Sequence, residues 1–224
     1  MVEAQGLTAE QKKGVIKTIA GVAAFIAVII AIFIHGLNKD RVMTFSDMKN
    51  NGAFVFDKPR SFKPFALVDA HNQPFTPDVL QGKWSLVFFG FTYCPDICPT
   101  TLALLNRFYE KQLSAEFGED LQIILVTVDP ARDTPEKLRD YIEYFNPKFK
   151  GVTGEFLDIH RFATQLNIPF SKVPGGGDNY TVEHSGNVAI INPLGHYVGF
   201  FKAPLELPKL NMTYKSIRLI NKDL

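Results

Sequence analysis

The chain has 224 residues, of which 46% are hydrophobic, and a formal net charge of +1 at pH 7. This length fits one domain with additional segments, or two small domains, and the apolar content is sufficient for a buried core. The near-zero charge gives no reason to expect a nucleic-acid partner. The two cysteines cannot form the disulfide framework of a small secreted protein.

A long apolar segment near the N-terminus predicts a membrane anchor. Residues 18–37 contain no Asp, Glu, Lys or Arg, and as a helix they would rise about 30 Å, the thickness of the hydrocarbon core of a bilayer. A cleaved signal peptide is the alternative, but its apolar region is typically only about 7–15 residues long. We therefore predict an uncleaved transmembrane anchor at 18–37, preceded by a tail at 1–17.

The charges beside this segment predict its orientation. Lys12, Lys13 and Lys17 precede it, whereas Lys39 and Arg41 follow it, and this bias favours a cytoplasmic N-terminal tail. The sequence before the anchor lacks the Arg- and Ser-rich character of a transit peptide. We therefore expect a single-pass protein of the bacterial inner membrane with its soluble domain in the periplasm, in preference to the mitochondrial inner membrane.

The rest of the chain divides into a polar linker at 38–60, with one short helix, and a domain at 61–224. Apolar runs and turn residues predict strands at 84–89 and 121–128 and hairpins at 62–75 and 186–201. Helices are predicted at 100–117, 155–166 and 205–219. A further helix is predicted to begin at Asp133 or Thr134 and to end at about Phe145. Residues 169–183, which are rich in glycine, predict a long mobile loop. This order predicts a mixed α/β sheet covered by helices on both sides, and it fits a thioredoxin-like fold.

Both cysteines lie at 90–99, between a predicted strand and a predicted helix. Backbone N–H groups and the positive end of the helix dipole at such a turn are expected to lower a thiol pKa. The spacing of Cys94 and Cys98 is C-x-x-x-C, which places residues i and i+4 on one helix face with Cβ atoms about 5–6 Å apart. This separation allows a shared metal ion, and it is also compatible with a disulfide, which needs Cα atoms within roughly 7 Å.

Three stretches together resemble the signatures of the Sco/SenC copper chaperones. These are GFTYCPDICP at 90–99, VDPARDTP at 128–135 and VEHS at 182–185, and the resemblance extends from about residue 62 to the C-terminus. It implies a single copper site made by Cys94, Cys98 and His184, and delivery of copper to the dinuclear copper centre of a cytochrome c oxidase. A thiol reductase that keeps the cysteines reduced is a further expected partner. The chain departs from the family at Glu183, where Asp is frequent.

The chemistry of the residues agrees with this implication. Two thiolates and one imidazole form a soft set of ligands that suits Cu(I) and can also hold Cu(II), whereas structural zinc prefers four ligands. Glu183 or a backbone carbonyl could orient the ring of His184. Asp129, at the end of an inner strand, either makes a local turn or acts near the copper site, and the sequence leaves both roles open.

A second hypothesis is a thiol–disulfide oxidoreductase or redox sensor that acts on oxidase cysteines, with Cys94 and Cys98 as its redox-active pair. The usual spacing in such enzymes is C-x-x-C, and the position where they place a cis-proline is occupied here by 183–185. A peroxiredoxin-type peroxidase is remote, because Phe91 stands where such enzymes have threonine. The residues therefore favour a metal site, and the resemblance to the Sco/SenC chaperones implies a metal-binding assembly factor more than an enzyme.

Overall fold

In the computed structural model, residues 9–38, 42–114, 120–173 and 180–221 are described. The chain divides into two compact units, one up to Arg41 and one from Val42 onward. The second unit thus begins well before residue 61, where the sequence predicted the start of the domain.

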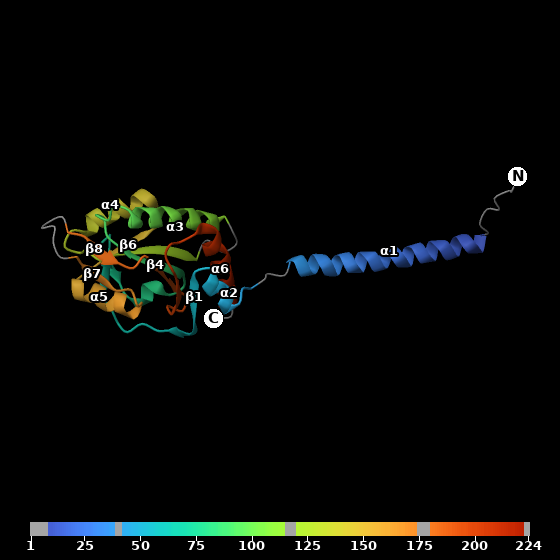
Figure 1. The fold of residues 1–224 in the computed structure, drawn as a ribbon, viewed down its shortest axis with the longest axis horizontal. Coiled ribbons are helices and arrows are strands. Elements are labelled where there is room, and N and C mark those ends of the chain that lie inside the picture. The colour runs from blue at the N-terminus through green and yellow to red at the C-terminus, as the bar shows by residue number, and fades with distance from the viewer. Residues whose placement is uncertain (1–8, 39–41, 115–119, 174–179, 222–224) are drawn as a thin grey trace. The chain divides into compact units, whose positions relative to one another are not determined.

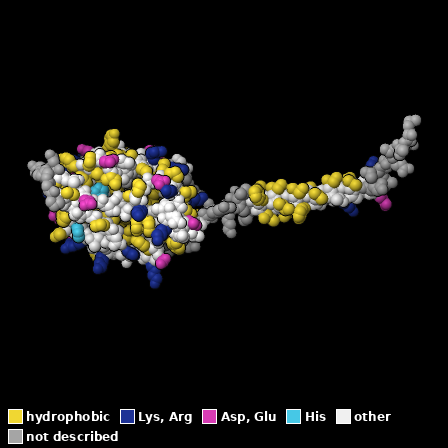
Figure 2. Space-filling model, viewed as in Figure 1, with side chains coloured by type: hydrophobic (Ala, Val, Ile, Leu, Met, Phe, Trp, Pro, Cys, Tyr) yellow, Lys and Arg dark blue, Asp and Glu magenta, His cyan; other side chains and the backbone are white. Residues whose placement is uncertain are grey.

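The first unit contains one long helix, α1 (Ala9–Asn38). Its segment Lys12–Ile34 is 23 residues long and, by length and composition, apolar enough to cross a membrane. Apolar side chains cover much of this helix in the space-filling view (Figure 2). α1 includes the predicted anchor at 18–37, but it begins earlier, so residues 9–17 of the predicted tail are helical. Residues 1–8 of that tail lie outside the described residues.

The second unit is built on an eight-stranded mixed sheet (Figure 1). Its strands, in spatial order, are β1 (Ala53–Arg60), β10 (Tyr197–Phe201), β9 (Val188–Ile191), β4 (Trp84–Gly90), β5 (Leu121–Thr127), β6 (Lys150–Thr153), β2 (Leu67–Asp69) and β3 (Pro74–Phe75). β4, β5 and β6 are parallel neighbours, and the other pairs are antiparallel. Every residue of β4 and β5 is buried, as expected for the centre of a sheet covered on both faces.

Helices cover the two faces of this sheet (Figure 1). They are α2 (Phe45–Asn50), α3 (Ile97–Leu113), α4 (Pro135–Phe145), α5 (Phe156–Gln165) and α6 (Leu207–Ile220), with a short 3-10 helix at Pro77–Leu80. Alternate residues of β4 face opposite layers. Trp84 packs against Tyr214 of α6 with ring centroids 6.0 Å apart, and Phe89 packs against Phe162 of α5 at 5.9 Å. The predicted mixed α/β sheet with helices on both sides is confirmed.

The segment 38–60 differs from the linker that the sequence predicted. The expected short helix is present as α2, whose first turn is capped by Thr44, which accepts a hydrogen bond from the N–H of Asp47. β1 then adds an edge strand to the sheet, and Ala53 pairs with Phe201 of β10. Because the two partners are so far apart in sequence, the local residue pattern of β1 does not reveal the pairing.

The predicted mobile loop at 169–183 contains one strand and most of the other strand of a second, two-stranded sheet. β7 (Phe170–Lys172) pairs with β8 (Val182–His184), and Phe170 lies opposite His184. Residues 174–179, which contain the glycines, lie outside the described residues. Strands of three residues escape prediction, because the glycine-rich stretch beside them dominates the pattern.

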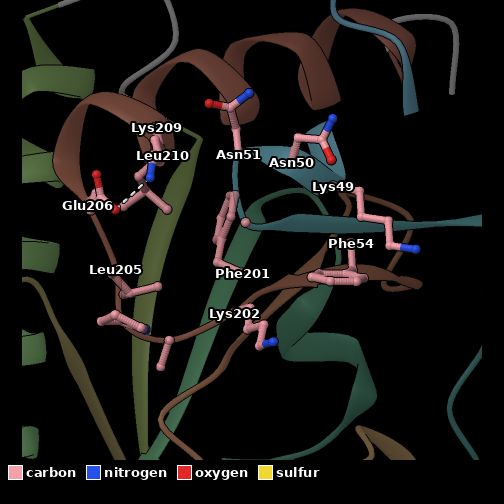
Figure 3. Close-up of a pocket in the computed structure, with 13 residues that line it drawn as sticks. Lys49, Asn50, Asn51, Phe54, Phe201, Lys202, Leu205, Glu206, Lys209 and Leu210 are labelled. Carbon is pink, nitrogen blue, oxygen red and sulfur yellow. Dashed lines mark hydrogen bonds and ion pairs between the residues drawn. The ribbon is translucent and has the colours of Figure 1, made fainter. Parts of the chain in front are cut away.

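A hollow of about 360 Å³ lies between the end of α2, the end of β10 and the start of α6 (Figure 3). Two of its polar side chains have partners: Lys209 forms an ion pair with Glu206 at 2.6 Å, and the Asn51 amide donates to the carbonyl of Asp47 at 2.8 Å. Neither a cysteine nor a histidine is among the described residues that line it. The hollow is therefore distinct from the cysteine turn.

Candidate metal centre

The end of β4 and the start of α3 position the two cysteines. β4 ends at Gly90, and the chain turns before α3 begins at Ile97. Cys94 therefore lies in the turn, and Cys98 lies in the first turn of the helix, where its N–H donates to Cys94 Sγ over 3.4 Å. Cys94 is 9% exposed and Cys98 is fully buried. The predicted succession of strand, cysteine turn and helix is confirmed.

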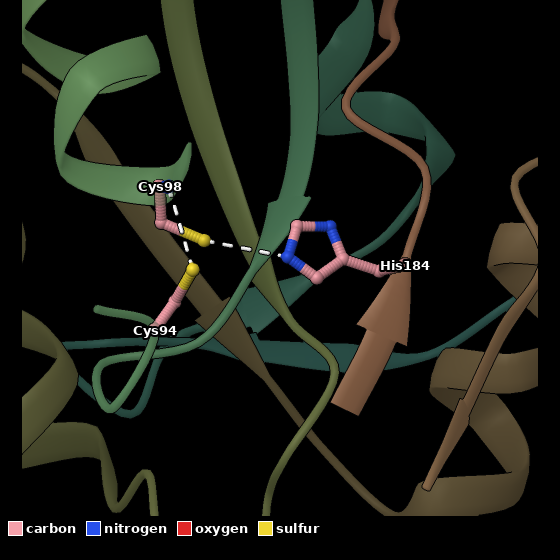
Figure 4. Close-up of side chains that lie close together, drawn as sticks. All are labelled: Cys94, Cys98 and His184. Atoms are coloured by element: carbon pink, nitrogen blue, oxygen red, sulfur yellow. Dashed lines mark hydrogen bonds between the residues drawn. The ribbon is translucent and has the colours of Figure 1, made fainter. Parts of the chain in front are cut away.

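β8 brings His184 to the same place (Figure 4). His184 Nε2 lies 3.4 Å from Cys98 Sγ, and the ligand atoms of Cys94, Cys98 and His184 all lie within 4.8 Å of one another. These are the residues that the resemblance to the Sco/SenC chaperones implies as ligands. Within the part of the chain that the structure describes, no other group of three or more Cys, His, Asp or Glu side chains brings its ligand atoms this close together.

The backbone and two aromatic rings orient the imidazole. His184 Nδ1 lies 3.2 Å from the carbonyl oxygen of Ser185, which can only accept, so we assign the ring proton to Nδ1 and the lone pair to Nε2. Phe88 and Phe91 pack edge-on against the ring, with centroids 6.0 and 5.9 Å away. The lone pair on Nε2 therefore faces the sulfur of Cys98, as coordination of a shared metal ion requires.

Burial favours the uncharged forms of the inner thiol and of the imidazole. It raises the pKa of the Cys98 thiol, and a hydrogen bond with Cys94 raises this pKa further. Burial lowers the pKa of His184, although the contact with the Ser185 carbonyl acts in the opposite direction. The sequence predicted a lowered thiol pKa at this helix start; for Cys98 the prediction is wrong, because desolvation by burial outweighs the backbone hydrogen bond at Phe91 that lowers the pKa. A metal ion that binds here must displace the thiol proton.

A hollow of about 320 Å³ gives solvent access to the site. Cys94 and His184 line it together with Phe91 and residues 95–97 and 181–183. Cys98 is fully buried, and it is not among the residues that line the hollow. An ion or a partner's ligand that enters from solvent therefore meets Cys94 and His184 before it meets Cys98.

A buried carboxylate holds the cysteine turn in place. Asp133 is fully buried and accepts hydrogen bonds from Thr92 N–H at 3.0 Å, from Thr92 Oγ1 at 2.6 Å and from Thr127 Oγ1 at 2.6 Å. The sequence marked Asp133 only as one of two candidate helix caps, and the cap of α4 is Thr134, which accepts from the N–H of Lys137. Asp133 instead ties the turn before Cys94 to the end of β5.

Neither of the two residues that the sequence named as assisting the site, Glu183 and Asp129, forms a hydrogen bond to a ligand side chain among the described contacts. Glu183 is exposed, and among the described contacts the Ser185 carbonyl, not the Glu183 carboxylate, meets the imidazole. Asp129 is 3% exposed and accepts hydrogen bonds from Arg132 and Tyr180. Asp129 therefore contacts the segment that leads into β8.

Gly90 is a further residue on which the geometry depends. A Cβ at this position would lie 2.8 Å from Cys98 Sγ, closer than real Cβ atoms approach a neighbour. We expect Gly90→Ala to displace the Cys98 side chain, to lower the free energy of unfolding by about 1–3 kcal/mol, and to weaken the binding of a soft metal ion. Thermal unfolding and metal titration measure the two effects.

Gly154→Ala is the matched control for this change. Its added Cβ would lie 2.8 Å from Leu67 Cδ2, an equally close approach at a place without cysteines. This variant should lose a similar amount of stability and keep the native metal affinity. Equal metal affinities in the Gly90 and Gly154 variants would contradict the role assigned to Gly90.

Comparisons with known proteins agree with this geometry. The model of the SCO1/SenC family matches residues 56–217. A putative copper-binding protein of Stutzerimonas stutzeri is 42% identical over 163 residues, which cover 73% of this chain and 79% of that protein. The mitochondrial protein SCO1 of Saccharomyces cerevisiae is 35% identical over 180 residues, which cover 79% of this chain and 60% of that protein.

Solved structures show the same fold. The structure of Arabidopsis thaliana ScoI with copper bound has a TM-score of 0.65 and 32% identity, and the match covers 70% of this chain and 98% of that one. Yeast Sco1 with copper bound also has a TM-score of 0.65 and 32% identity, over 74% of this chain and 91% of that one. The thioredoxin-like fold that the sequence predicted is confirmed. The family model spans most of the second unit, and the chain belongs to the SCO1/SenC family.

Proposed function

We propose that the protein is a membrane-anchored copper metallochaperone that delivers copper to the dinuclear copper centre of a cytochrome c oxidase. The observation that carries the proposal is the convergence of Cys94, Cys98 and His184, whose ligand atoms lie within 4.8 Å of one another. Two thiolates and an imidazole are the soft ligands that copper prefers. Related proteins from Arabidopsis and yeast, each 32% identical, have been solved with copper bound.

The arrangement of the ligands suits a carrier, which must hold its cargo and also release it. Three ligands leave a coordination position free for a ligand of the partner. Cys94 and His184 line the solvent-facing hollow, so an incoming ligand can replace them one after the other. Cys98 lies beneath them and is the last protein ligand to be exchanged.

The long apolar helix and the thiols define the expected surroundings of the domain. The apolar helix segment at 18–37 anchors the chain in the bacterial inner membrane, and the domain lies in the periplasm, where the copper-containing subunit of an oxidase can meet it. Thiols oxidise readily in that compartment, and only thiolates bind the metal. A thiol reductase that restores Cys94 and Cys98 is therefore a second partner.

A second candidate function is thiol–disulfide exchange on oxidase cysteines. It is favoured by the two sulfur atoms, which lie within 4.8 Å of each other and next to a hollow that admits a partner. In this function Cys94, at the mouth of the hollow, is the attacking sulfur and Cys98 resolves the mixed disulfide. The imidazole of His184 has no required role in that exchange.

Replacement of His184 by Ala distinguishes the two functions. The native protein should bind about one Cu(I) per chain. We expect the variant to lose copper delivery to the oxidase subunit, because an essential ligand is gone, while disulfide exchange with a model substrate stays within about twofold of native. His196→Ala, in the turn between β9 and β10, is the control and should change neither activity. If the His184 variant still matures the oxidase fully, the exchange function is correct and the carrier function is not.

A further inference from the structure

His184 lies on a hairpin that stands outside the eight-stranded sheet. Among the described strands, β7 and β8 pair only with each other. Side chains must therefore hold the hairpin against the domain, and these contacts determine how firmly the imidazole stays over the two sulfurs. At one end of β7, Phe170 packs against Phe156 and His160 of α5, with ring centroids 5.7 and 5.8 Å away.

At the other end of the hairpin, Tyr180 contacts a buried carboxylate. Its hydroxyl donates to Asp129 Oδ1 over 2.5 Å. Asp129 is 3% exposed, and its other oxygen accepts from Arg132 Nε over 2.5 Å. A carboxylate is tolerated in such a place only when its oxygens have donors. The Tyr180 hydroxyl is therefore part of what stabilises Asp129 in the folded domain.

The ring of Tyr180 makes a second kind of contact. The guanidinium carbon of Arg132 lies 3.7 Å from the centroid of the Tyr180 ring and 4.7 Å from that of Tyr93. Cation–π attraction strengthens when the cation is shielded from water, and the Arg132 side chain is only 16% exposed. Lys172 of β7 adds its Nζ at 3.5 Å from the Tyr180 ring. Because Tyr93 directly precedes Cys94, Arg132 joins the hairpin to the cysteine turn.

We propose that Tyr180 is a positioning residue for the metal centre. Its contacts with Asp129 and Arg132 keep the β7–β8 hairpin closed, so that His184 faces the two sulfurs. Tyr180 lies just before β8. Because β8 is short and extended, a displacement of Tyr180 also displaces His184 at the other end of the strand. When these contacts are broken, the hairpin opens, the imidazole leaves, and copper stays on the two sulfurs alone. The inference rests on the proposed function, because it assigns a role at the same site.

The first test follows the coordination of copper in two variants of residues 42–224, which form a compact unit that contains the buried core. Tyr180→Phe removes only the hydroxyl, and Tyr180→Ala removes the ring as well. X-ray absorption of the Cu(I)-loaded native protein should show two sulfur ligands and one nitrogen. We expect the alanine variant to lose the nitrogen and to release Cu(I) to a chelator about tenfold faster, with the phenylalanine variant in between.

Tyr144 supplies the matched controls. It is 85% exposed, so Tyr144→Phe and Tyr144→Ala should keep native coordination and the native release rate. Retention of the nitrogen ligand and of the native release rate in Tyr180→Ala overturns the inference. A native protein that takes up no copper counts against the proposed function, and the second test then decides the inference on its own.

The second test needs no metal. Hydrogen exchange of the backbone amides that pair β7 with β8 should be about tenfold faster in Tyr180→Ala, whereas the amides of β4 and β5 should exchange as in the native domain. Unchanged protection of the hairpin overturns the inference. If Tyr180→Ala also loses protection in β4 and β5, Tyr180→Phe tests the inference in its place. The inference then requires the β7–β8 amides of Tyr180→Phe to exchange faster than in the native domain while β4 and β5 keep native protection. Native protection of the hairpin in Tyr180→Phe overturns the inference.

Discussion

Replacing Cys98 with Ser is expected to lower the affinity of the domain for Cu(I) by more than about 100-fold. Substitution of a residue that only orients a ligand typically costs about 10–100-fold in metal affinity, and Cys98 is itself a ligand in the proposed site. A hydroxyl is a hard, protonated donor that does not replace a thiolate for a soft ion. Competition with a chromophoric Cu(I) chelator measures the change.

Cys94→Ser should show a loss of the same order, and it controls for folding. Cys98 is fully buried, so serine there also places a hydroxyl in the core, whereas Cys94 is 9% exposed. Met212→Leu is the matched control, because it removes a sulfur atom from a side chain of α6 that is 51% exposed. This variant should bind copper as the native domain does. Native affinity in a folded Cys94→Ser domain would show that the metal binds elsewhere.

The sequence predicts the centre of the fold well, because there the signals are local. β4 and β5 are continuous apolar runs, and each is buried along its whole length. The hairpin predicted within 62–75 is present as β2–β3, and its turn includes Asn72, which has a positive φ of 59°. The helices have the expected spacing of apolar residues, and the start of α4 is marked by its cap, Thr134, followed by Pro135.

Where strand pairing or side-chain burial depends on residues far apart in the sequence, the local residue pattern does not predict it. β1 and β6 are strands because β10 and β5 lie beside them, and their own residues carry a weak signal. The spacing of the cysteines allowed a shared metal ion or a disulfide, but it did not indicate that Cys98 would be buried deeply enough for desolvation to raise its pKa. In the same way, the motif at 128–135 drew attention to Asp129, whereas only the folded chain shows that Asp133 holds the cysteine turn.

Replacing Asp133 with Ala is expected to destabilise the metal-free domain by about 3–5 kcal/mol. The change removes the acceptor of three hydrogen bonds and leaves the N–H of Thr92 without this partner in a buried place. For a domain of this size, a loss of about 3–5 kcal/mol corresponds to a fall in Tm of roughly 10 °C. Calorimetry or circular dichroism of residues 42–224 measures it. Because Thr92 lies two residues before Cys94, copper affinity should fall as well.

Asp133→Asn distinguishes the contribution of the hydrogen bonds from that of the negative charge, because it removes the charge and keeps one acceptor oxygen. Thr92 N–H and Thr127 Oγ1 donate to the same oxygen, Oδ2, so an asparagine oxygen at that place can still accept from both. The Thr92 hydroxyl, which donates to Oδ1, can rotate to accept from the amide that replaces this oxygen, so we expect a smaller loss, of about 1–2 kcal/mol. Asp96 lies in the same turn, is exposed, and makes no side-chain cap to α3, so Asp96→Ala should stay within about 0.5 kcal/mol of native. If Asp133→Ala is as stable as Asp96→Ala, then Asp133 does not hold the turn, and the position of Cys94 must be fixed by the helix and the strand on either side of it.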